Sequence, residues 1–244
     1  MNSGLNLVAE RLWPFLVGAW ALSAVLNRGL RRPNPFDSAV PEITRWIHDQ
    51  QLSGWVVWTT LRPELVQTVT LKARRSRGRF RGATYHFRSH TAIIDALQWQ
   101  QPVTEWIWDA CHELRHPQQT SLFYSRWRKI KSVAECGLGV GMILSIWSGP
   151  VWIPWIVVTL SAGFYAVADL IPELDAVSST PEILDTVLAR WAADSPVQIA
   201  WRQQASQAMR ADTFTYLRNT STVTLFLWAI AMTISLILHT IIPK

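Results

Sequence analysis

The chain has 244 residues and a formal net charge of +6, with 49% hydrophobic and 16% charged residues. This length suits one or two compact domains. The apolar residues collect in long runs and the charges collect between them, which argues against a water-soluble globule and favours a membrane protein. Many of the fifteen Trp residues lie at the ends of these runs, where the membrane interface accommodates an amphipathic indole. The alternative for some of them is ordinary core packing.

The first apolar run extends from Leu12 to Leu26. A cleaved signal peptide carries positive charge before its apolar core. Here Arg11 is offset by Glu10, and the basic residues follow the run instead. We therefore predict that residues 1–32 form an uncleaved transmembrane anchor with its N-terminus outside.

Residues 33–132 form a polar segment with secondary structure of its own. Apolar positions on one face predict a first helix, alternation of apolar and polar residues predicts strands, and Pro102 suits the start of a second helix. The predicted elements are a helix over Pro41–Gln51, strands over Gly54–Thr60, Leu65–Ala73 and Ala83–Ser89, and a helix over Val103–Gln118.

The second half of the chain alternates between apolar and polar segments. Gly137–Ala168 contains no charge and is too long for one span, and Ser148-Gly149-Pro150 interrupts it. We predict a transmembrane helical hairpin over 133–171, a helical polar segment over 172–221, and a last transmembrane helix over 222–244.

Basic residues decide the predicted orientation. Residues 27–132 contain seventeen Lys and Arg and residues 172–221 contain four, against two in the remaining segments. The positive-inside rule places both polar segments in the cytoplasm. The expected fold is thus a mainly α integral membrane protein of a bacterial-type plasma membrane, with about four transmembrane helices and a small cytoplasmic α+β unit. The two cysteines, Cys111 and Cys136, then lie near the cytoplasm, where a disulfide is not expected.

The stretch WIWDACHELRHPQQ, residues 106–119, contains the pattern HExxH. Two histidines four residues apart on a helix point the same way, so His112 and His116 can reach one Zn²⁺ ion. Glu113 points to the side and can serve as the general base that takes a proton from a zinc-bound water. The alternative is a pair of ordinary histidines on a helix surface.

A catalytic zinc needs a third protein ligand and one open position. Glu173 follows the predicted hairpin directly. The chain crosses the membrane and returns, so Glu173 comes back to the side that holds His112 and His116. The alternative is a solvated acid at a helix end.

These stretches resemble the YugP-type membrane-bound neutral zinc metallopeptidases. The family's HExGHAxQ element is similar to residues 112–119, and its Pro-x-Glu-x-Asn-Ala-Ser-like element is similar to residues 172–176. Its Leu-Thr-Tyr element is similar to residues 213–216. The resemblance implies a zincin-like unit and a peptidase acting on proteins or peptides, with zinc held by His112, His116 and Glu173. Tyr216 is a candidate donor to the oxyanion, or an anchor of the last span at the interface.

The chain also departs from that family. Arg115 stands where the family has Gly, and the basic stretch Lys72–Arg81 stands where the family has an acidic one. These departures favour an alternative function, a catalytically silent membrane scaffold or regulatory protein. The basic stretch is expected to contact anionic lipid headgroups rather than nucleic acid. By analogy with the fold, a substrate strand would add to the sheet edge along Ala83–Ser89.

Overall fold

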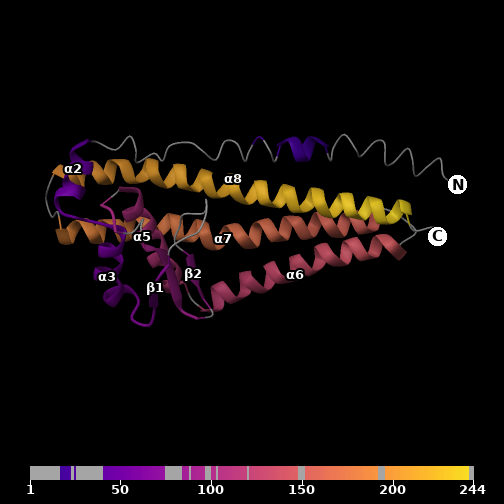
Figure 1. Cartoon of the computed structure of the whole chain (residues 1–244), viewed down its shortest axis with the longest axis horizontal. Helices are drawn as coiled ribbons and strands as arrows, with labels where there is room; N and C mark the ends of the chain where they lie inside the picture. The colour runs from indigo at the N-terminus through magenta and orange to yellow at the C-terminus, as the bar shows by residue number, and fades with distance from the viewer. Residues whose placement is uncertain are drawn as a thin grey trace. The chain divides into compact units, whose positions relative to one another are not determined.

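The computed structural model describes residues 17–22, 25, 41–74, 84–87, 89–96, 100–102, 104–119, 121–147, 152–191 and 196–241. These residues are mostly helical, with one small sheet of three strands, as the sequence predicts (Figure 1). The chain divides into two compact units. The mixed unit comprises residues 33–121 and 173–214, and the helical unit comprises 1–32, 122–172 and 215–244.

The mixed unit combines helices with the sheet. Its elements are α2 (Pro41–Asp49), α3 (Gly54–Leu65), β1 (Thr70–Arg74), β2 (Thr84–His86), β3 (Thr91–Asp95), α5 (Thr104–Arg115) and the short 3₁₀ helix η3 (His116–Gln118). It also includes the later part of α7 (Trp152–Trp191) and the earlier part of α8 (Pro196–Ile241). The helices predicted over Pro41–Gln51 and Val103–Gln118 are confirmed.

The strand predicted over Gly54–Thr60 is wrong, because this stretch begins helix α3. Ser53 caps that helix: its hydroxyl accepts a hydrogen bond from the backbone N–H of Val56. Val57, Trp58 and Leu61 fall on one helical face and are fully buried. Burial of that face outweighs the β preference of the valines and threonines, which is a weak prior.

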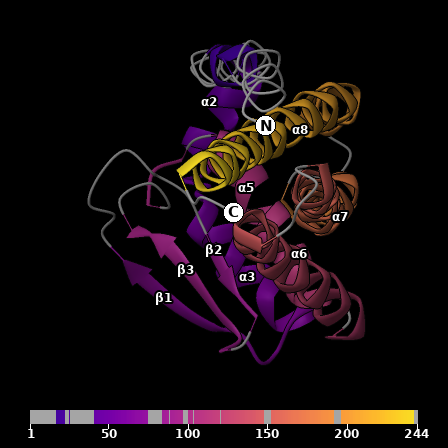
Figure 2. The ribbon, with the colours of Figure 1, turned by 90° about the vertical axis from the view of Figure 1, so that its right-hand side faces the viewer.

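The sheet has the order β1-β3-β2, so β3 lies in the middle (Figure 2). Strand β3 runs parallel to β1 and antiparallel to β2. The strand predicted over Leu65–Ala73 begins only at Thr70, because Leu65 still belongs to α3. The strand predicted over Ala83–Ser89 narrows to β2, and β3 was not predicted.

The core of the mixed unit holds α5 in place. Ile107, Trp108, Cys111 and Leu114 are buried at helical spacing on one face of α5. Each fully buried side chain of this size contributes about 1.5–3 kcal/mol relative to exposure. With this face committed to the core, α5 cannot rotate about its axis, and the directions of His112 and His116 are fixed.

The helical unit contains α6 (Ser121–Trp147), the first part of α7 and the second part of α8, which lie side by side (Figures 1 and 2). Among the described helices, α7 and the Pro196–Leu238 part of α8 are long and apolar enough to cross a membrane. The sequence predicted four such spans. The N-terminal span falls largely outside the described residues, as does the predicted turn at 148–150. Helix α6 is not among the described helices that are long and apolar enough to cross a membrane.

Close packing joins the helices of this unit. Leu138, Val158, Ala162, Ala231 and Met232 form its core. Their apolar neighbours on the outer faces remain exposed, among them Val140, Ile143, Ile156, Leu160, Phe164, Phe226 and Ile237. Such exposed stripes are what helices in contact with lipid carry.

Asp169, which comes just after the uncharged stretch Gly137–Ala168, is paired. Its carboxylate lies 2.5 Å from the Lys131 ammonium and accepts a hydrogen bond from Thr220 at 3.3 Å. The pairing removes most of the cost of a charge beside an apolar segment.

Candidate metal site

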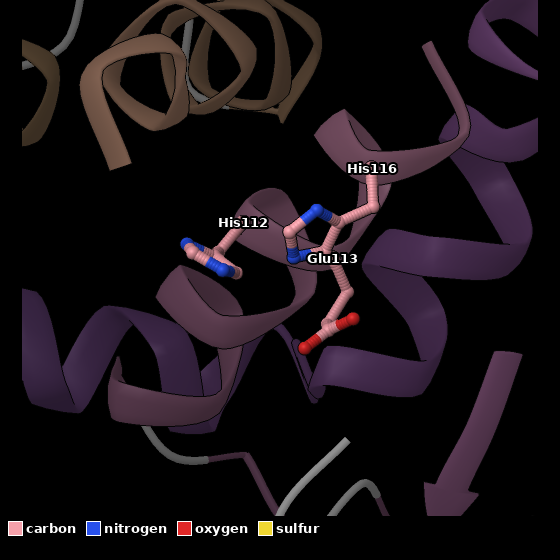
Figure 3. A group of neighbouring side chains, drawn as sticks. All are labelled: His112, Glu113 and His116. Atoms are coloured by element: carbon pink, nitrogen blue, oxygen red, sulfur yellow. The ribbon is translucent and has the colours of Figure 1, made fainter. Parts of the chain in front are cut away.

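His112 lies on α5 and His116 begins η3, which continues that helix, and both side chains are buried. Pro117 lacks an N–H donor, and the α-helix ends at Arg115, where η3 takes over. The two imidazole rings lie next to each other, with centroids 5.0 Å apart and planes at 82° (Figure 3). The spacing in the sequence therefore brings the two histidines together as predicted.

Three side chains here could hold a metal ion. His112, Glu113 and His116 offer ligand atoms that all lie within 4.8 Å of one another (Figure 3). Imidazole nitrogen and carboxylate oxygen are a donor set that suits Zn²⁺ and other first-row divalent ions. The structure thus places at HELRH a group of side chains that could hold a metal ion.

A second carboxylate also reaches the histidines. Glu173, on α7 in the same unit, places Oε2 3.2 Å from His112 Nε2 and 3.6 Å from His116 Nε2. In a tetrahedral zinc site with bonds of about 2.1 Å, ligand atoms lie about 3.4 Å apart. The two distances bracket that value, so the three residues predicted from the sequence lie together at ligand spacing.

The two carboxylates differ in their partners. Glu173 is engaged by both histidines, whereas Glu113 Oε2 is buried and has no hydrogen-bond partner among the described residues. Burial raises the pKa of Glu113 above its usual range, against the opposing attraction of His116 and His112. Burial also acts on Glu173, but hydrogen bonds from His112 and His116 outweigh it and hold the pKa of Glu173 well below its usual range. The surroundings thus shift the pKa values of the two carboxyl groups in opposite directions.

His116 is the histidine with a shifted pKa. Burial lowers this pKa, but the Glu173 carboxylate, the charge of Glu113 and the hydrogen bond to Gln119 together raise it to about 9. In the metal-free protein this imidazole therefore holds a second proton at neutral pH.

The guanidinium of Arg115, which follows Leu114 in the HELRH stretch, is paired with the carboxylate of Asp175. The guanidinium donates to both carboxylate oxygens of Asp175, from Nε at 3.0 Å and from Nη2 at 3.3 Å. Burial opposes ionisation of Asp175, but the hydrogen bonds from Arg115 and Gln119 lower its pKa. The charges of Arg115 and Asp175 thus neutralise each other.

Sequence reasoning missed two residues of this neighbourhood. Gln119 is buried between His116 and Asp175, and Asp212 on α8 accepts a hydrogen bond from Trp108 Nε1 at 3.0 Å. Burial raises the pKa of Asp212, while the hydrogen bond from Trp108 and the charge of His112 lower it. The resemblance over residues 112–119 includes Gln119 but says nothing of its contacts, and Asp212 belongs to no spacing pattern in the sequence.

Other predicted residues lie elsewhere. Tyr216 belongs to the part of α8 that lies in the helical unit, and its role as an oxyanion donor stays a prediction. Most of the basic stretch falls on residues 75–83, outside the described residues. Asp175 contacts Arg115 and Gln119.

Comparisons of the chain with protein-family models, curated proteins and solved structures find no match. The resemblance to the YugP-type peptidases stays a prediction that the short stretches at 112–119, 172–176 and 213–216 carry.

Proposed function

We propose that the chain is a membrane-embedded zinc-dependent endopeptidase that hydrolyses peptide bonds in protein or peptide substrates. The observation that carries this proposal is the convergence of two imidazole nitrogens on one oxygen of Glu173, at 3.2 and 3.6 Å. His112, His116 and Glu173 would be the zinc ligands. Bound zinc would supply a water of pKa about 7 and polarise the substrate carbonyl.

Glu113 fits the role of general base better than that of third ligand. Its Oε2 is not engaged by any described residue, so it is available to a water or to a substrate amide. Burial raises its pKa above the usual range, and a more basic carboxylate is a better acceptor for the proton of a water. Glu113 would take the proton from the attacking water and pass it to the leaving amine.

The remaining parts of the proposal concern location and substrate access. The apolar helices α7 and α8 support a place in a bilayer, and the excess of Lys and Arg in the polar segments supports a cytoplasmic site. Strand β2 is at an edge of the sheet, which supports addition of a substrate strand there. The residues at 72–81 would contact anionic lipid headgroups.

The test is zinc content and peptide hydrolysis by the full chain in detergent, for wild type, His112→Ala and Glu173→Ala. His48→Ala is the matched control, because His48 is an exposed histidine of the same unit. We expect about one zinc per wild-type chain, its loss in both site variants, and hydrolysis that a chelator abolishes and zinc restores. Wild type without zinc, or Glu173→Ala with full zinc, would refute the ligand assignment.

The second candidate function is the silent scaffold. One observation favours it: His112 and His116 already satisfy Glu173 without a metal, so the cluster can persist as a buried hydrogen-bonded group. Zinc bound without hydrolysis of any peptide in a broad library would support the scaffold. Chelator-sensitive hydrolysis that Glu113→Gln abolishes would eliminate it.

A further inference from the structure

We infer that Arg115, Asp175 and Gln119 form a positioning chain that holds His116 in the tautomer and orientation required of a metal ligand. This inference rests on the proposed zinc site and names residues that neither bind the metal nor touch the substrate. The hydrogen bonds of this positioning chain lead from Arg115 to Asp175, from Asp175 to Gln119, and from Gln119 to His116 Nδ1, all within the mixed unit.

The carboxylate of Asp175 accepts hydrogen bonds from two side chains of the positioning chain, Arg115 and Gln119. Asp175 receives two hydrogen bonds from the Arg115 guanidinium, at 3.0 and 3.3 Å. Its Oδ2 also accepts from Gln119 Nε2 at 3.0 Å. An ionised carboxylate can only accept hydrogen bonds. Asp175 therefore dictates that Gln119 turns its NH₂ group toward α7.

This dictates the tautomer of His116. With its NH₂ group on Asp175, Gln119 directs Oε1 to His116 Nδ1, 3.4 Å away. A carbonyl oxygen accepts only, so Nδ1 must carry the proton. In the neutral ring the lone pair then lies on Nε2, the nitrogen 3.6 Å from Glu173 Oε2. Ligating histidines commonly donate their other N–H in this way, which fixes the ring and raises its basicity.

One helix thus acts on both nitrogens of the same imidazole. Residues two apart on a helix point in nearly opposite directions, so Glu173 and Asp175 of α7 cannot meet the same atom. Glu173 faces Nε2 directly, and Asp175 acts on Nδ1 through Gln119. The Arg115 guanidinium is directed to Asp175 rather than to the proposed metal ligands, because it donates two hydrogen bonds to that carboxylate. Arg115 thus anchors the hydrogen bonds that orient His116.

The alternative is that Arg115 and Asp175 merely tether α5 to α7. A tether would change thermal stability without changing zinc affinity. The decisive variant is Gln119→Met, which keeps the volume of this buried side chain and removes both hydrogen bonds. The rescue is Gln119→Glu combined with Asp175→Asn. The carboxylate then accepts from His116 Nδ1 and the amide of the second change donates to it, so the same tautomer is restored with the charges exchanged.

The measurement is zinc affinity of the full chain by competition with a chromogenic chelator, together with the ¹⁵N shifts of His116 in the zinc-loaded protein. We expect Gln119→Met to weaken zinc binding about 10–100-fold and the double variant to return close to wild type. The exposed residue Gln203, in the same unit, supplies the control Gln203→Ala, which should change nothing.

Two results would overturn the positioning chain while the zinc site stands. One is wild-type affinity in Gln119→Met. The other is a folded double variant as weak as Gln119→Met. A wild-type chain that binds no zinc overturns the proposed function as well. Tight zinc binding without peptide hydrolysis leaves the positioning chain in place and removes only the peptidase.

Discussion

Glu113→Gln should separate catalysis from metal binding and from stability. The variant keeps the shape of the side chain and removes its basicity, so hydrolysis should fall about 10²–10⁴-fold, a barrier increase of about 3–5 kcal/mol. Zinc content should stay at the wild-type level, because His112, His116 and Glu173 are the proposed ligands. Stability of the metal-free form should rise, because the buried Oε2 has no partner among the described residues and burial disfavours its charge.

The size of that rise follows from the burial. A buried carboxylate without a partner costs more than a neutral amide in the same place, by an amount on the order of 1–3 kcal/mol, and about 2–4 °C of melting temperature corresponds to each kcal/mol at this chain length. Thermal unfolding of the chelator-treated protein should show an increase of several degrees. Loss of zinc in Glu113→Gln would show that Glu113 is itself a ligand. A lower melting temperature would show that its carboxylate has a stabilising partner.

Four further predictions concern His116, Trp108 and Gly141. The pKa of His116 is raised to about 9, so zinc binding near pH 7.5 should release a proton from this imidazole. Zinc affinity should then rise as the pH rises toward 9. Calorimetry in buffers of different ionisation enthalpy would measure the proton release. The contribution of that raised pKa to metal-free stability should be complete below the ordinary value of 6.5 and lost as the pH rises through about 9; a flat denaturation profile would contradict it. Trp108→Phe removes a hydrogen bond that the buried control Trp58→Phe does not, so it should cost about 1–3 kcal/mol more in chemical denaturation. In α6, a Cβ at Gly141 would lie 2.6 Å from a methyl group of Val158, whereas one at Gly139 meets nothing within 4 Å. Gly141→Ala should therefore lower the melting temperature in detergent, and Gly139→Ala should leave it unchanged or raise it.

The site was more predictable than the sheet. HELRH has a spacing that only a helix converts into two adjacent imidazoles, and Glu173 was found because a hairpin must return to its starting side. Both arguments depend on geometry that does not change with tertiary context. The contacts of Gln119 and Asp212 could not be found this way, because they depend on which side chains meet after folding.

The errors in the sheet have a different cause. Gly54-Trp-Val-Val-Trp-Thr-Thr has the composition of a strand, yet a cap at Ser53 and burial of Val57, Trp58 and Leu61 make it a helix. Strand β3 has five residues, too few for alternation to stand out, and it is defined by pairing with β1 and β2. Local pattern cannot report on partners that are distant in the sequence.

The separation of the site's two halves along the chain has a consequence for biosynthesis. His112 and Glu173 are 61 residues apart, and α6 and the apolar start of α7 lie between them. At about 5–20 residues per second, a ribosome needs about 3–12 s to add the acid after the first histidine. During that interval the nascent chain carries two histidines without their carboxylate partner. Glu173 can therefore join the two histidines only after α6 and the apolar start of α7 have been synthesised.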